Sequence, residues 1–320
     1  MAISKYELSV DTAFNPPKVT VTPQVSNNGV WYVQGKNLMT PNNQPFRPIG
    51  VEMNSWNQDW YDTYAYITAA AAAGVNTVRI VPAYLEPTPT NTGTQHTANE
   101  IDSLIAFAAS KGLLVDVAPD GGKRLDTFQN AALKNVFTLR KSNVVIHGKG
   151  EGNEQYGSQW RDAAIARVAA LRSAGYTQPL YMLANEYGRN LPAILQHGQA
   201  VLDSDPLHSI VFGWQAYWGT SNYYQNKYFK TLSQGITDAA NSPLCIQVGI
   251  MEHTDWDTNP SETVSGGVPS LLNLLNTHNL GWLWWDWRLG PDNLGYGTYQ
   301  NSAAALAAKG ANGFGQAVKY

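Results

Sequence analysis

The chain has 320 residues, a formal net charge of −3 and only 14% charged residues. This length fits one large α/β domain or two medium ones, and the near-neutral charge argues against nucleic acid or a membrane surface as the main partner. The sequence also contains 11 Trp and 17 Tyr. Aromatic faces and side-chain amides suit carbohydrate binding, whereas a Trp-rich core is the alternative explanation, and we expect the two to share these residues.

Residues 1–28 are polar and weakly alternating, and they predict an extended arm. Residues 31–39 predict a short hairpin that leads into a buried strand at 47–52. No apolar run is long enough to span a bilayer, and the N-terminus has no signal pattern. We expect an extracellular protein whose signal peptide has been removed, with a cytoplasmic location as the alternative.

An apolar, β-branched run follows each helix-like segment, so that with the strand at 47–52 the chain has about eight strands. These runs cover residues 76–81, 113–118, 143–148, 179–184, 209–214, 245–250 and 281–287. Strands that alternate with helices predict a parallel sheet, and eight such units favour closure. We therefore expect an α/β fold with a single (β/α)8 TIM barrel over residues 29–320.

Two helices carry clear terminal signals. Thr97 and Glu100 form a capping-box pattern at the start of one helix, and Gly112 ends it. The second helix is predicted to begin at Ser158, as its cap, and to end before Gly175.

Chemistry in a closed barrel lies at the C-terminal ends of the strands. Carboxylates and aromatic residues dominate these positions: Glu52, Asp116, Glu151, Glu154, Glu186, Trp214, Tyr217, Glu252 and Trp285. Two carboxyl groups facing a Trp-lined cleft are what glycoside hydrolysis requires, because one protonates the leaving oxygen and the other attacks the sugar or activates water. Arg79 lies in an apolar strand and needs a carboxylate partner, because an unpaired buried charge is costly.

Other chemistries find little support in the sequence. Cys245 is the only cysteine, and its apolar surroundings predict a buried core residue. The few histidines are scattered, and no Gly-rich phosphate loop of recognised spacing is present, so we expect no metal site and no cofactor.

Several stretches resemble glycoside hydrolase family 5, in the cellulase and mannanase clan, from about Val30 to the C-terminus. They include "YVQGKNLMTPNNQPFRPIGV" at 32–51, "GVNTVRIV" at 74–81, "NEQYG" at 153–157 and "GWLWWDW" at 281–287. The resemblance implies hydrolysis of a β-linked polysaccharide, mannan- or glucan-like, by a two-carboxylate, retaining mechanism.

The resemblance also implies roles for particular residues. Glu154 would be the general acid/base, with Asn153 contacting the sugar 2-hydroxyl, Arg79 in the site and Trp285 under the sugar. The family's nucleophilic Glu is replaced by Ile250, and Glu252, two residues later, would substitute for it. Trp214 and Tyr217 stand near the places of a family His and Tyr, and we expect them to bind substrate.

Three alternatives remain open at this point. An ungapped count along the fourth strand puts Glu151, instead of Glu154, at the acid position. Glu186 is predicted to line the cleft, yet a rebuilt acid–base site could use it or Glu252. The altered positions also allow a barrel that has lost catalysis and binds sugar or serves a structural role.

Overall fold

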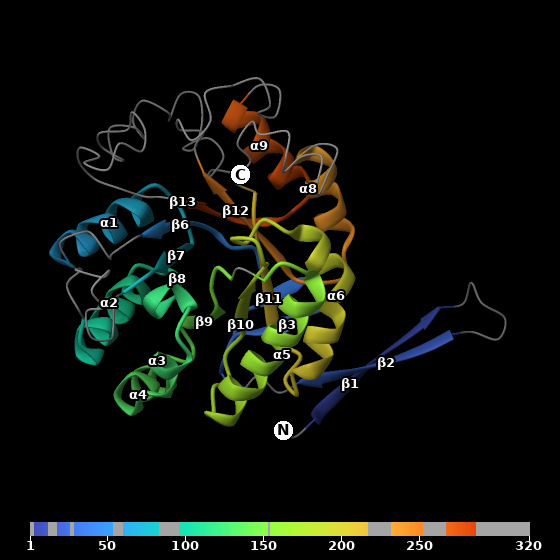
Figure 1. The fold of residues 1–320 in the computed structure, drawn as a ribbon, viewed down its shortest axis with the longest axis horizontal. Coiled ribbons are helices and arrows are strands. Elements are labelled where there is room, and N and C mark those ends of the chain that lie inside the picture. The colour runs from blue at the N-terminus through green and yellow to red at the C-terminus, as the bar shows by residue number, and fades with distance from the viewer. Residues whose placement is uncertain are drawn as a thin grey trace.

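The structure, a computed structural model, describes residues 3–11, 18–25, 29–53, 60–82, 96–152, 154–216, 232–251 and 267–285. Its centre is a closed barrel of eight parallel strands (Figure 1). These strands are β6 (Ile49–Met53), β7 (Thr77–Ile80), β8 (Leu114–Val117), β9 (Val144–Lys149), β10 (Leu180–Leu183), β11 (Ile210–Gln215), β12 (Ile246–Met251) and β13 (Gly281–Trp285). β13 pairs with β6 and closes the ring. The predicted (β/α)8 barrel and all eight predicted strands are confirmed.

Helices connect the strands and cover the outside of the barrel. They are α1 (Trp60–Ala72), α2 (Ala98–Ser110), α3 (Leu125–Gln129), α4 (Ala131–Leu139), α5 (Gly157–Ser173), α6 (Leu191–Ser204), α8 (Leu232–Asn241) and α9 (Gly267–Thr277), with a 3-10 turn, η1 (Pro119–Gly122), after β8. The capping box of Thr97 and Glu100 is present at the start of α2. The predicted cap Ser158 is wrong, because α5 begins at Gly157 and the Gln159 side chain instead accepts hydrogen bonds from the main-chain N–H groups of Gln155 and Tyr156.

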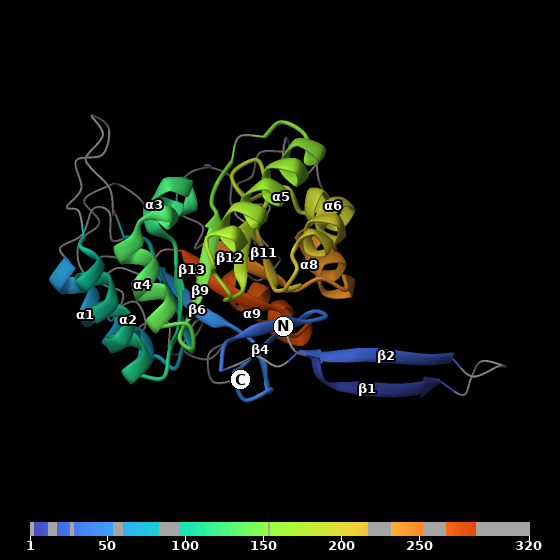
Figure 2. The same cartoon turned by 90° about the horizontal axis from the view of Figure 1, so that it is seen from below.

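The predicted N-terminal arm contains two strands. β1 (Ile3–Asp11) and β2 (Lys18–Val25) pair with each other antiparallel. Figures 1 and 2 show this ribbon extending away from the barrel.

A small three-stranded sheet closes the barrel at the N-terminal ends of its strands. It consists of β3 (Tyr32–Gln34), β4 (Asn37–Met39) and β5 (Pro45–Phe46), and it contains the predicted hairpin. Trp31, Val33 and Leu38 pack in one buried cluster with interior barrel side chains such as Val145 and Val211. The Trp31 indole N–H also donates to the Ser142 carbonyl at 2.8 Å. The hairpin therefore seals one end of the barrel interior, and the other end remains for a site.

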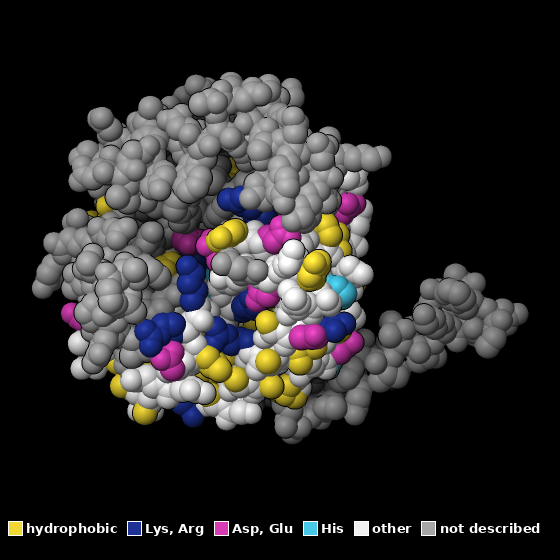
Figure 3. Space-filling model, viewed as in Figure 1, with side chains coloured by type: hydrophobic (Ala, Val, Ile, Leu, Met, Phe, Trp, Pro, Cys, Tyr) yellow, Lys and Arg dark blue, Asp and Glu magenta, His cyan; other side chains and the backbone are white. Residues whose placement is uncertain are grey.

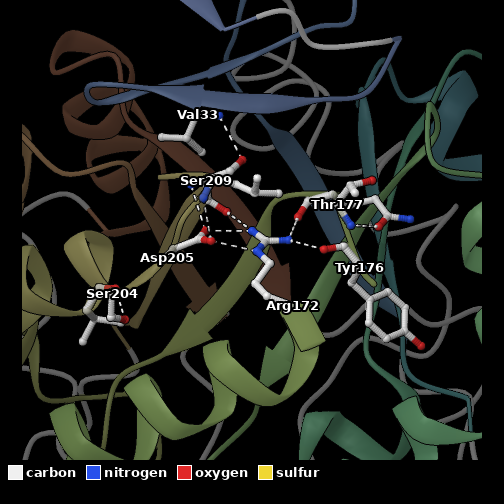
Figure 4. Close-up of polar contacts among 10 residues, drawn as sticks. Val33, Arg172, Tyr176, Thr177, Ser204, Asp205 and Ser209 are labelled. Atoms are coloured by element: carbon white, nitrogen blue, oxygen red, sulfur yellow. Dashed lines mark hydrogen bonds and ion pairs between the residues drawn. The ribbon is translucent and has the colours of Figure 1, made fainter. Parts of the chain in front are cut away.

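A buried ion pair ties this sealed end together (Figure 4). Arg172, near the end of α5, donates to both carboxylate oxygens of Asp205, at 2.8 and 2.7 Å. The same guanidinium donates to the carbonyls of Tyr176 and Gln178. Asp205 in turn accepts from the Ser209 N–H, and the Ser209 hydroxyl accepts from the N–H of Val33 in the hairpin. One arginine thus links α5, the loops before β10 and β11, and β3.

Candidate active site

Alternate side chains of each barrel strand point to the interior and to the helices. Val145, Tyr181 and Val211 belong to the interior cluster that includes Trp31, whereas Ile210 and Phe212 pack in the larger cluster that includes the helix residues. Continuing this alternation to the C-terminal ends of the strands gives the inward-facing set Glu52, Arg79, Asp116, His147, Lys149 and Gln215. These six side chains lie at the C-terminal end of the barrel interior, opposite the hairpin.

Arg79 is the centre of a buried ionic cluster. Its Nε donates to Asp116 at 2.6 Å and its Nη1 donates to Glu52 at 2.9 Å, while the guanidinium lies 4.3 Å from the centre of the Tyr181 ring. Burial opposes the charge of Arg79, but Asp116, Tyr181 and Glu52 outweigh it and hold its pKa well above the usual value. The predicted need for a carboxylate partner is met twice.

The two carboxyl groups of this cluster differ in their ionisation. Burial opposes the ionisation of Asp116, but Arg79 and His147 outweigh it, so the pKa of Asp116 is lowered. Burial raises the pKa of Glu52 more than Arg79 lowers it, and the charges of Asp116 and Glu151 add to the rise. Asp116 is therefore the fixed counter-ion of Arg79, and Glu52 is the carboxyl group of the pair that takes up a proton more readily.

His147 extends the cluster along β9. Its Nδ1 lies 3.7 Å from Asp116, and its ring lies against Tyr181 with 4.6 Å between centroids. Burial, and then the charge of Arg79, lower the pKa of His147. Burial raises the pKa of Tyr181 to about 12. Both rings are consequently neutral near pH 7 and support Arg79 without adding charge.

We expect His147→Gln to reduce the loss of stability on mild acidification. The folded state binds a proton at His147 less readily than the unfolded chain, whose His titrates near 6.5, so stability falls as the pH drops below about 6.5. One proton changes the free energy of unfolding by at most about 1.4 kcal/mol per pH unit. Urea unfolding of both proteins at pH 7.5, 6.5 and 5.5 measures this slope. Equal slopes in the two proteins would contradict the assignment.

Glu154 lies beside this cluster, in the loop after β9. One of its carboxylate oxygens is 2.7 Å from the ammonium group of the buried Lys149. Its other carboxylate oxygen is buried and accepts no hydrogen bond from the described residues. Its main-chain carbonyl accepts from the side-chain amide of Asn185 at 2.9 Å. The carboxyl group of Glu154 is therefore fixed in place, and one of its oxygens can still form a hydrogen bond with a ligand.

Glu151, the alternative acid, has a different environment. Its side chain is exposed, whereas that of Glu154 is 19% exposed and paired with Lys149. Glu151 lies close enough to Glu52 for its charge to contribute to the raised pKa of Glu52. The more enclosed and better-anchored carboxyl group is that of Glu154.

The structure corrects one predicted substrate contact. Trp214 is fully buried in the core shared with the helices, because alternation along β11 turns it outward and turns Gln215 inward. Gln215 therefore takes the place at the open end that we had predicted for Trp214. The same alternation applies on β12, where Ile250 is fully buried in that outer core.

Other predicted site residues are only partly described or lie outside the description. Glu186 begins the turn that follows β10, and its place beside a cleft stays a prediction. Trp285 is the last residue of β13, whose backbone alone is described there. Asn153, Tyr217 and Glu252 lie outside the described residues.

Four site residues were not identified from the sequence: His147, Lys149, Tyr181 and Gln215. All four are polar or aromatic residues of strands that otherwise read as apolar. Their shared inward phase is the signal that could have revealed them, since each falls an even number of residues from an interior position of its strand.

Within the described part of the chain, no three His, Cys, Asp or Glu side chains form a group suited to a metal ion. No described helix is long and apolar enough to cross a membrane. On the face seen in Figure 3, the described acidic and basic side chains are interspersed.

Comparison with known proteins agrees with the observed fold. The family model described as cellulase (glycosyl hydrolase family 5) matches residues 39–290. A mannan endo-1,4-beta-mannosidase from Salipaludibacillus agaradhaerens is 27% identical over 274 residues, which are 81% of each chain. A second mannan endo-1,4-beta-mannosidase, from Cellvibrio japonicus, is 24% identical over 84% of this chain and 62% of that protein.

Solved structures show the same fold. A crystal structure of a beta-mannanase from Streptomyces thermolilacinus with mannohexaose superposes with a TM-score of 0.69 at 18% identity, covering 90% of this chain and 95% of that one. The fold and the family match together define a glycoside hydrolase with a (β/α)8 barrel. The chain belongs to glycosyl hydrolase family 5, the cellulase family.

Proposed function

We propose that this glycoside hydrolase cleaves internal bonds of a β-1,4-linked mannan, with Glu154 as its general acid/base. The observation that carries the proposal is the enclosed Glu154 carboxyl group, which pairs with Lys149 while Asn185 fixes the Glu154 main-chain carbonyl. The substrate class is supported by the two curated relatives, both of which are named as mannan endo-1,4-beta-mannosidases.

The mechanism requires a second carboxyl group. We assign it to Glu252, which follows the last residue of β12 directly. In a retaining reaction this carboxylate attacks the anomeric carbon while Glu154 protonates the leaving oxygen, and Glu154 then removes a proton from the water that completes hydrolysis. A retaining mechanism requires the two carboxyl groups to be about 5 Å apart, one on each side of the bond.

Other residues would hold the sugar. Arg79 is kept charged and rigid by its two carboxylates, and Gln215 provides an amide at the rim. We assign further contacts to Asn153, Tyr217 and Trp285, on the family resemblance of their motifs. Because polymeric mannan does not cross a cell membrane, we expect the enzyme to meet this substrate outside the cell.

Release of reducing ends from mannan, cellulose and xylan tests the substrate class. We expect mannan to be the best substrate, with short manno-oligosaccharides among the early products and retained configuration in the proton NMR spectrum of the first product. Binding of mannan without release of reducing ends would contradict the proposal. Equal rates on all three polysaccharides would contradict the mannan preference.

A further inference from the structure

The turn after β10 has an unusual backbone. Glu186, Tyr187 and Gly188 have consecutive positive φ angles of 52°, 58° and 81°. For residues with a side chain this left-handed conformation costs roughly 1–2 kcal/mol each, and a bulky Tyr rarely adopts it. Such conformations persist where the surrounding structure imposes them, and they cluster at ligand sites.

Two neighbouring segments impose this turn. On one side the Tyr187 N–H donates to the Gly152 carbonyl at 3.3 Å, and Gly152 also forms a β-bridge with Asn185. On the other side the Gln215 N–H donates to the Gly188 carbonyl at 2.8 Å. A Cβ atom on Gly188 would lie 2.8 Å from the Gln215 side chain, so a glycine is needed there for space as well as for conformation.

The turn is joined to the proposed acid/base. Gly152, which accepts from Tyr187, packs so closely against the carboxyl group of Glu154 that a Cβ atom there would overlap it. Asn185, the residue before the turn, donates to the main chain of Glu154. The main chain of Tyr187 is thus fixed relative to the Glu154 carboxyl group through a single intervening residue.

The Tyr187 side chain on this turn faces solvent. Tyr187 is 50% exposed, and Tyr156, two residues after Glu154, is 57% exposed. Both tyrosines lie on loops at the C-terminal ends of adjacent strands, β9 and β10. The turn thus presents an aromatic ring to solvent near the proposed acid/base, where the apolar face of the ring is available to a sugar.

We propose that Tyr187 is a specificity-determining residue that stacks on a sugar unit of the polysaccharide next to the bond cleaved at Glu154, with Tyr156 extending the same surface. The inference rests on the substrate class of the proposed function. On this proposal the strained backbone of residues 186–188 serves substrate binding, because the turn sets the position of the Tyr187 ring.

Binding and stability of Tyr187 variants test the proposal. In affinity electrophoresis through mannan-containing gels, Tyr187→Ala should bind roughly three- to tenfold more weakly than the unmodified chain, and Tyr187→Phe should bind as the unmodified chain does. Leu139→Ala is the matched control, because Leu139 is also exposed but lies at the end of α4. Its binding should not change.

Tyr187→Gly separates substrate binding from a structural role. Glycine relieves the left-handed strain, so we expect this variant to unfold about 2–4 °C higher while binding mannan as weakly as Tyr187→Ala. A lower unfolding temperature, or mannan binding by Tyr187→Ala equal to that of the unmodified chain, would overturn the inference. Binding and release of reducing ends are measured in separate assays. If the unmodified chain releases no reducing ends but Tyr187→Ala still binds mannan more weakly than it does, the proposed hydrolysis is rejected and this inference is kept. If the unmodified chain releases reducing ends and Tyr187→Ala binds mannan equally well, the proposed hydrolysis is kept and this inference is rejected.

Discussion

Glu154→Gln is expected to lower kcat on mannan by about 10²–10⁴-fold, the range that general acid–base catalysis contributes. Glutamine has nearly the same shape but supplies no proton to the leaving oxygen. The measurement is the initial rate of reducing-end release, with a thermal unfolding curve to show that the protein remains folded without the ion pair to Lys149.

The control for this prediction is Glu151→Gln, which changes the exposed carboxyl group of the same loop. We expect it to change kcat far less than Glu154→Gln does. A nitrophenyl mannoside needs little protonation of its leaving group, so the Glu154→Gln variant should recover much of the lost rate of bond cleavage with it. If Glu151→Gln were the more damaging change, the ungapped alignment of the fourth strand would be correct and Glu151 would be the acid.

Arg172→Met is expected to lower the free energy of unfolding by about 3–5 kcal/mol, because it leaves the fully buried carboxylate of Asp205 without its partner. It also removes the hydrogen bonds to the Tyr176 and Gln178 carbonyls. Arg161→Met is a matched control, since Arg161 lies on the same helix and pairs with an exposed Asp162. Urea unfolding should show a large shift of midpoint for the first variant and none for the second.

The dependence of stability on acidic pH is a second measurement of the Arg172–Asp205 pair. Burial opposes ionisation of Asp205, but Arg172 and the main-chain N–H groups outweigh it and lower its pKa. The stability it contributes is therefore present above the ordinary Asp value, near 4, and is lost as the pH falls below that value towards the lowered pKa of the folded state. A midpoint of Arg172→Met close to that of the unmodified chain at pH 7 would show that the pair contributes little.

Much of the fold was predictable because each strand is a short apolar run between helical segments. The order and number of these runs predict the closed barrel. The direction in which strand residues point was harder to predict. Both faces of a parallel strand are buried, so "SIVFGW" shows no alternation that would tell Trp214 from Gln215. For that reason the inward amide was missed and the outward Trp was assigned to the site.

The site was predictable only where a motif accompanied a strand end. Glu154 stood out through "NEQYG", and Arg79 through its charge in an apolar strand. Lys149 carried no such signal, because its partner Glu154 lies across the turn of chain at Gly152, and only the folded loop brings the ammonium and the carboxylate together. The left-handed turn at 186–188 was equally hidden, since neither Glu nor Tyr indicates a positive φ.

The hairpin that seals the lower end of the barrel separates the tasks of the two ends. Its Trp31, Val33 and Leu38 anchor the interior from below, while the loops after β9 and β10 carry the proposed acid and the sugar-facing tyrosine. Substitutions in the loops after the strands need not disturb the packing of the hairpin. The fold therefore tolerates variation in these loops that would destabilise it if it occurred in the hairpin. Directed evolution towards a new glycan would therefore best randomise the loops after β9 and β10 and leave the hairpin and the Arg172–Asp205 ion pair unchanged.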